Sequence, residues 1–150
     1  FILDYKPEAL DRIYELTHGQ PYLTQLVGFL LVRLYNDRVF EMGHPRDPIF
    51  TIEDVETVIN NPEFFTNARY YLTGVWGQAA EGASGQQEIL KALAPHLKGM
   101  NFDRLSAETG MDKTSLEEAL KTLERHDVVK EINGCYCIAV ELFRRWVLKL

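Results

Sequence analysis

The feature that most constrains this fold is a break at residues 18–21, which separates two segments with helical apolar spacing. Gly19 suits the position after a helix end, because glycine adopts a positive φ at little cost. Pro21 suits the first turn of the next helix, where its missing N–H would have no intrahelical partner. We therefore expect a helix over residues 7–17, a corner, and a second helix from residue 21 to about residue 41.

The second helix is the most apolar segment of the chain. Its leucines and valines recur every three or four residues, and Phe29 and Val32 add apolar surface on a second side. A helix that is apolar around most of its circumference is contacted from several sides. The pattern therefore predicts that residues 21–41 form the central helix of a helical bundle.

Two more helices are predicted after a loop at residues 42–50. Thr51 precedes an acidic first turn and is expected to be an N-cap, and Pro62 opens a segment rich in aromatic residues. Aromatic side chains at helical spacing favour core packing over a ligand cage. Glycine, alanine and serine are frequent in residues 77–85, which indicates a linker and predicts two units, residues 1–80 and 84–150.

The second unit has the pattern of a winged helix. Its first helix is marked by Ile89, Leu90, Leu93 and Leu97. A short second helix ended by Gly110 precedes a longer helix, which Asp112 or Thr114 would cap. Asn133-Gly134 then separates two β-rich runs, the strongest local signal for a hairpin, and a last helix begins near Val140. The predicted fold is mainly α: a helical bundle followed by a winged helix-turn-helix domain with one β-hairpin.

The charge distribution bears on what the winged helix contacts. Residues 1–82 carry 6 Lys+Arg against 12 Asp+Glu, whereas residues 83–150 carry 10 against 10. The candidate DNA contacts on the third helix are Lys113, Lys121 and Arg125, but Glu117 and Glu118 lie among them. Because clustered cations supply most DNA affinity, we expect a packing or protein-contact module. DNA binding stays as the alternative if Lys121 and Arg125 share a face with the two arginines of residues 144–145.

The sequence lacks the residue patterns that several kinds of chemistry require. The chain has no phosphate-binding loop of the type G-x-x-x-x-G-K-[ST], so it is not expected to hydrolyse nucleotide by itself. No histidine lies in a nucleophile signature, and His44 with Asp47 is too small a set for a metal site. Cys135 and Cys137 would lie on one face of a strand and form a poor disulfide pair, which indicates the reducing cytoplasm. No apolar run suggests a membrane span, and the start at Phe1 suggests a piece of a longer chain.

Residues 16–26 read Leu-Thr-His-Gly-Gln-Pro-Tyr-Leu-Thr-Gln-Leu, and the winged-helix pattern follows them. Together they resemble the C-terminal part of prokaryotic AAA-like ATPases of the AAA+ and STAND group, which carry a Gly-[His/Gln]-Pro-Tyr-Leu stretch in an α-helical lid. The resemblance implies an upstream P-loop core, the lid at residues 1–80 and the winged helix at residues 84–150. It places Gly19, Gln20 and Pro21 at the edge of a bound nucleotide, with Tyr22 adjacent.

The resemblance also implies a function and its alternatives. The parent would be a regulatory or signalling ATPase that binds ATP or ADP, with Mg²⁺ held by its core, while residues 1–150 alone would need no cofactor. The winged helix would dock on that core, on a protein partner or on a second copy. No arginine follows Pro21 until Arg33, which departs from many AAA+ lids and favours a STAND-like protein. The alternatives are the DNA-binding winged helix of an initiator- or transposition-type AAA+ ATPase, and a free-standing interaction module.

Overall fold

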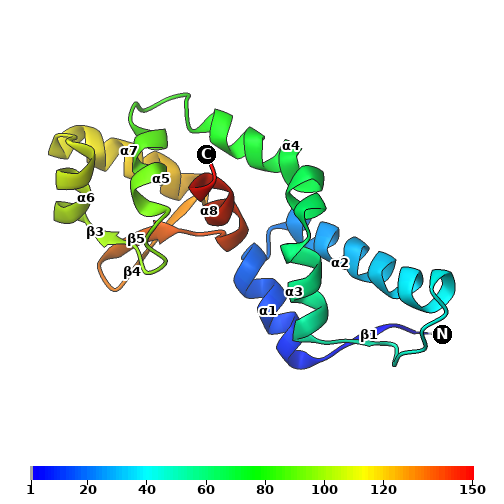
Figure 1. Ribbon diagram of the computed structural model, residues 1–150. Coiled ribbons are helices and arrows are strands. Elements are labelled where there is room, and N and C mark those ends of the chain that lie inside the picture. Colours follow the sequence, from blue (N-terminus) through cyan, green and yellow to red (C-terminus); the bar gives the residue numbers. More distant parts are fainter. Residues whose placement is uncertain (1) are drawn as a thin grey trace. The chain divides into compact units, whose positions relative to one another are not determined.

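The computed structural model describes residues 2–150 and divides into two compact units, one ending at Arg69 and one beginning at Tyr70 (Figure 1). Helices dominate both units, and each unit has one small sheet. The predicted fold class, a helical bundle followed by a winged helix, is confirmed. The chain divides within helix α4, Pro62–Gln78. The expected unit boundaries at residues 80 and 84, with a lid as the first unit, stay a prediction.

The N-terminal unit is built from helices that meet at tight corners. Its elements are β1 (Asp4–Tyr5), α1 (Pro7–Thr17), α2 (Pro21–Asn36), a π-helical turn η1 (Asp37–Glu41), β2 (Ile49–Phe50), α3 (Ile52–Asn60) and the start of α4. The predicted helix from residue 21 to residue 41 is right in extent, but its last turn is π-helical. The parallel pairing of β1 with β2 was not predicted, because two-residue strands carry no sequence pattern. Phe1 lies outside the described residues.

Helix α2 corrects the prediction of a central helix. It buries one stripe, formed by Leu23, Val27, Leu31 and Tyr35, against α1, α3 and the segment around β2. Phe29 on another side is 64% exposed. The prediction was wrong for this unit, because among the described residues the packing helices cover only part of the α2 circumference.

An ion pair ties the loop before α3 to the N-terminus of that helix. Arg46 donates from its two terminal nitrogens to the Asp54 carboxylate at 2.8 and 2.7 Å, and its guanidinium lies 5.8 Å from the ring centroid of Tyr35. Burial raises the pKa of Asp54, but the hydrogen bonds from Arg46 and Thr51 outweigh burial and lower it overall. Asp54 also completes a capping box with Thr51, which confirms the predicted N-cap.

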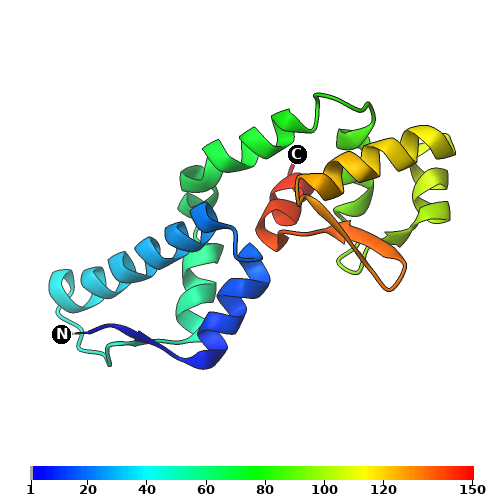
Figure 2. The same cartoon turned by 180° about the vertical axis from the view of Figure 1, so that it is seen from behind.

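The C-terminal unit is a winged helix. After the end of α4 its elements are α5 (Gln86–Leu93), β3 (Met100–Asn101), α6 (Phe102–Thr109), α7 (Lys113–Arg125), β4 (Val129–Ile132), β5 (Cys135–Ile138) and α8 (Glu141–Leu148). The strands form an antiparallel sheet in the order β3-β5-β4 (Figure 2). Asn133 and Gly134 both have positive φ in the predicted hairpin turn. Strand β3 was missed, because its two residues pair only through the tertiary fold.

Aromatic side chains fix the end of α4 within the C-terminal unit. The Trp76 and Trp146 ring centroids lie 6.2 Å apart, and Phe143 stacks on Trp146 at 5.9 Å. Gln87 donates from its side-chain nitrogen to the Trp76 carbonyl at 2.9 Å. These contacts join α4, α5 and α8, so the aromatic residues predicted to pack do so at least at Trp76.

Gly99 allows the turn before β3 to approach β5 closely. Its φ is +78°, and a Cβ placed on it would collide with the carbonyl oxygen of Tyr136, a backbone atom that cannot rotate away. We expect Gly99→Ala to lower the free energy of unfolding by about 3 kcal/mol or more, from strain and collision together. Gly110 has a φ of +70° and open space around it, so Gly110→Ala should cost only about 1–2 kcal/mol. Urea denaturation of both variants tests this, and equal destabilisation of the two would contradict the collision.

Candidate functional site

The corner between α1 and α2, residues 18–21, is held from inside by a buried hydroxyl group. Thr17 is fully buried, and its Oγ1 donates to the Ile13 carbonyl at 2.8 Å. The same oxygen lies 3.2 Å from the backbone nitrogen of Gly19, from which it accepts, and 3.1 Å from the hydroxyl oxygen of Thr24 on α2. One side chain therefore links the end of α1, the corner and the first turn of α2.

Two successive residues with positive φ turn the chain at this corner. His18 has φ 52° and ends α1, and its N–H donates to the Tyr14 carbonyl at 2.7 Å. Gly19 follows with φ 70°, which confirms the positive φ predicted for it. A Cβ on Gly19 would lie 3.4 Å from the Tyr14 ring, so the corner is also closely covered on that side.

The other predicted site residues begin α2. Gln20 is its N-cap, and the side-chain oxygen accepts from the Leu23 N–H at 2.8 Å. Pro21 is the first helical residue, as predicted, and its side chain is exposed. The hydroxyl of Tyr22 donates to the Asn67 carbonyl at 3.2 Å. The structure therefore brings Gly19, Gln20, Pro21 and Tyr22 together on one accessible corner. Their contact with a nucleotide stays a prediction.

The second candidate site is the helix-turn-helix of α6 and α7. Asp112 is the N-cap of α7 and accepts from the Ser115 N–H at 3.3 Å. Of the two caps predicted, Asp112 is therefore confirmed and Thr114 is wrong, because the helix already begins at Lys113. Four residues of α7 are buried: Leu116, Ala119, Leu120 and Leu123.

The solvent face of α7 carries both signs of charge. Lys113, Lys121 and Arg125 are exposed, and within residues 2–150 none of them is in an ion pair. Lys121 and Arg125 are one turn apart, so they lie on the same side of the helix. Glu117 and Glu118 are exposed between them and Lys113. The three cations therefore share a face, but they do not form an unbroken basic patch.

The junction between α7 and the hairpin is acidic, which sequence reasoning missed. Burial raises the pKa of Tyr136 on β5, and the carboxylates of Glu131, Glu124 and Glu117 raise it further. These three glutamates come from β4 and from two turns of α7, so only the tertiary fold brings them near one phenol. A phosphate backbone approaching both α7 and the wing would meet this negative potential.

The two arginines of residues 144–145 do not join the cations of α7. Arg144 donates to Glu141 at 2.6 Å and to the carbonyl of Ala94 at 2.6 Å, and Arg145 donates to Glu141 at 2.9 Å. Burial raises the pKa of Glu141, but the hydrogen bonds from both arginines lower it overall. The basic face that would favour DNA binding therefore does not receive these charges.

The remaining candidates for nucleophilic or metal chemistry are the cysteines and the possible metal ligands among residues 2–150. Cys135 and Cys137 are free, and burial raises the pKa of the Cys137 thiol, which disfavours the reactive thiolate. Residues 2–150 contain no group of three or more His, Cys, Asp or Glu side chains placed to hold a metal ion. None of the helices that these residues form is long and apolar enough to cross a membrane.

Comparison with known protein families gives a match for one part of the chain. Residues 88–132 match the family model of the IclR helix-turn-helix domain. The matched segment runs from α5 through β4 and contains Lys113, Lys121 and Arg125. No curated protein and no solved structure matches the chain. The helix-turn-helix predicted from the sequence is confirmed, and residues 88–132 are similar to the IclR helix-turn-helix domain.

The buried hydroxyl of Thr17 allows a direct test of the corner. We expect Thr17→Val to lower the free energy of unfolding by about 1–3 kcal/mol, because the Gly19 N–H loses a buried acceptor. Thr57 offers a matched control, since its hydroxyl also bonds a carbonyl one turn back, that of Glu53, but at an exposed site. Thr57→Val should change stability by about 0.5 kcal/mol or less. Thermal unfolding followed by circular dichroism measures both, and a Thr17 variant as stable as its control would contradict this account.

Proposed function

We propose that this chain is the lid and winged-helix part of a regulatory P-loop ATPase, and that the corner at residues 18–21 contacts bound ATP or ADP. The observation that supports the proposal is that the corner is held from inside and exposed outside. Thr17 fixes it from inside, while Gly19 and Pro21 face outward and are exposed. The Tyr14 ring covers the Cβ side of Gly19, so a ligand would approach the corner from its exposed side. The phosphates and Mg²⁺ would be held by a P-loop core, because residues 1–150 contain no phosphate-binding loop.

Exposed apolar side chains of the same unit support a covering domain. On α1, Leu10 is 52% exposed and Tyr14 is 59% exposed. On α2 and η1, Phe29 and Phe40 are each 64% exposed. Fully burying a side chain of this size stabilises a protein by about 1.5–3 kcal/mol. A core domain that covered any two of these side chains would therefore gain several kcal/mol, and the lid would close on it.

A switch of this kind needs a difference in contacts between nucleotide states. Moving a two-state equilibrium from 1:99 to 99:1 takes about 5.5 kcal/mol of differential binding. Two or three hydrogen bonds to charged phosphate groups supply this amount if only one state makes them. The winged helix would relay the change to a protein partner. The acidic junction of α7 with the hairpin favours such a partner over DNA.

The test is nucleotide binding by the full-length product of the gene that encodes this chain. We expect it to bind ATP or ADP, and Pro21→Ala to weaken binding about tenfold, because the variant lacks both the ring that touches the ligand and the fixed helix start. Pro7 is the matched control, because it is also exposed at the first position of a helix. Isothermal titration calorimetry measures all three proteins. A full-length product that ignores both nucleotides, or equal affinities for both proline variants, would overturn the proposal.

DNA binding is a second candidate function, favoured by the match to the IclR helix-turn-helix domain. In this reading α7 enters the major groove, and Lys113, Lys121 and Arg125 contact phosphates. The match covers the segment that would do so. The net charge of the matched segment argues against DNA binding, because residues 88–132 hold 7 Lys+Arg and 9 Asp+Glu.

Salt dependence separates the two readings. If α7 binds DNA, reversing Lys113, Lys121 and Arg125 to Glu should abolish retention on duplex DNA at low salt. Neutralising them to Gln should reduce the slope of log K against log[salt] by about 0.9 for each phosphate that the variant no longer neutralises. Neutralising Lys6, Arg38 and Lys98 removes the same charge outside α7 and serves as the control. Fluorescence anisotropy measures the slopes, and equal slopes for both triple variants would rule out DNA binding by α7.

A further inference from the structure

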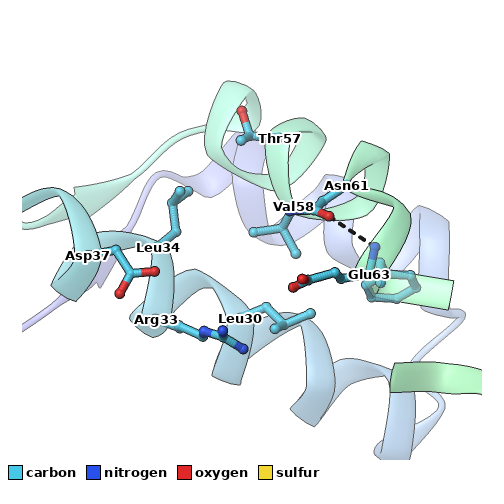
Figure 3. A pocket seen from close by; sticks show the side chains of 9 residues that line it. Leu30, Arg33, Leu34, Asp37, Thr57, Val58, Asn61 and Glu63 are labelled. Atoms are coloured by element: carbon cyan, nitrogen blue, oxygen red, sulfur yellow. Dashed lines mark hydrogen bonds between the residues drawn. The ribbon is translucent and has the colours of Figure 1, made fainter. Parts of the chain in front are cut away.

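We propose that an open pocket in the N-terminal unit binds a free apolar α-amino acid. The pocket has a volume of about 120 Å³ and lies between α2 and the corner where α3 meets α4 (Figure 3). An apolar cavity of about 150 Å³ is large enough to bind benzene, so this open pocket is on the scale of a single apolar side chain. The lining residues are Leu30, Arg33, Leu34, Asp37, Thr57, Val58, Asn61, Glu63 and Phe64. The site is separate from the corner at residues 18–21 and does not depend on nucleotide binding.

The floor of the pocket is apolar. Val58 and Phe64 are buried beneath it, and Leu30 and Leu34 are half-buried on the α2 side. The residues from α2 and η1 recur at spacings of three and four, so they form one stripe two turns long. A branched or aromatic side chain of a ligand would move from water into contact with apolar surface, on the α2 side and on the side of Val58 and Phe64.

Charged groups of opposite sign stand around this floor. Arg33, Asp37 and Glu63 are exposed, and none of them forms an ion pair with another residue that the structure describes. In Figure 3 the Glu63 carboxylate reaches over the pocket from α4, and Arg33 and Asp37 extend from the opposite wall. Asn61 accepts from the Glu63 N–H at 2.9 Å, which fixes the backbone that carries this carboxylate.

This set of groups fits a zwitterion with an apolar side chain. An ammonium group has three N–H donors and suits the carboxylates of Glu63 and Asp37. A carboxylate suits Arg33, whose guanidinium can donate two parallel hydrogen bonds. A ligand with only one charge would engage the groups of one sign alone. Free α-amino acids carry both charges on one carbon, next to the side chain that would enter the floor.

The net charge of the unit favours a ligand with an ammonium group. Residues 1–69 carry 6 Lys+Arg against 11 Asp+Glu, a net charge of −5. A carboxylic acid without an amine would be repelled by this field, while an amine alone would be attracted but would not engage Arg33. We therefore expect L-leucine to bind more tightly than isoamylamine, and isoamylamine more tightly than isocaproate.

The experiment titrates these three compounds into the 150-residue chain and follows amide chemical shifts by NMR. We expect saturable shifts with leucine, centred on α2 and the start of α4, and at least about tenfold weaker binding of each analogue. Arg33→Gln should remove the difference between leucine and isoamylamine. Glu63→Gln should weaken leucine binding by about tenfold. Glu53 is the matched control, because it also lies in the acidic first turn of a helix and is exposed.

Several outcomes would overturn the proposal. One is the absence of saturable shifts with leucine at concentrations up to about 10 mM. Equal binding of leucine and both analogues would mean that the charged rim does not recognise the ligand. Equal effects of Glu63→Gln and Glu53→Gln would place any binding outside this pocket. Circular dichroism of each variant confirms that the fold is intact, and Leu34→Asn, which changes only the floor, should abolish leucine binding in the same assay.

Discussion

The buried hydroxyl of Thr17 is the interaction on which the N-terminal unit depends. A helix end and a helix start both leave backbone groups without intrahelical partners, and burying such groups is costly. Thr17 supplies an acceptor to the Gly19 N–H and contacts Thr24 on the next helix, so α1 and α2 leave the corner in fixed directions. With that angle set, the apolar stripes of α1, α2 and α3 meet, and the outer residues of the corner stay free for a ligand.

The C-terminal unit shows how charge and fold can point to different functions. Residues 88–132 are similar to the IclR helix-turn-helix domain, and α7, the helix that such motifs place in the major groove, carries exposed cations. Glu117, Glu124 and Glu131 lie near enough to Tyr136 of the hairpin to raise its pKa, and Glu141 forms ion pairs with the two arginines of α8. Phosphate affinity depends on net positive charge over the contact surface, so the shape of the fold alone does not specify DNA. This balance is why we place protein contact ahead of DNA contact.

The two candidate ligand sites of the N-terminal unit differ in kind. The corner is built from backbone and has few side-chain charges, which suits a partner that supplies its own phosphates and metal from another domain. The pocket between α2 and the α3–α4 corner has three side-chain charges of both signs over an apolar floor. Because α2 contributes to both, a ligand in the pocket and closure at the corner would act on the same helix.

Local rules of the chain determined much of this structure. Pro21 at a helix start, Thr51 as a cap, Gly110 after α6 and Asn133-Gly134 in a hairpin each follow from backbone geometry within a few residues. Such features depend on near neighbours in sequence, so the order of helices and the winged helix could be predicted. The site residues at the corner could be placed for the same reason, since they end one helix and begin the next.

Only the tertiary structure decided which surfaces and charges meet. The parallel pairing of β1 with β2, the exposed side of α2 at Phe29, and the ion pair of Arg46 with Asp54 join segments that no sequence pattern links. The acidic junction around Tyr136 likewise needs α7 and the hairpin to pack before its charges interact. Burial and Coulomb interactions depend on distance in space, and sequence spacing fixes that distance only within a single helix or hairpin. Helices, turns and the helix-turn-helix were therefore determined by the sequence alone, whereas the pocket and the electrostatic character of the winged helix were set by the packing of those elements.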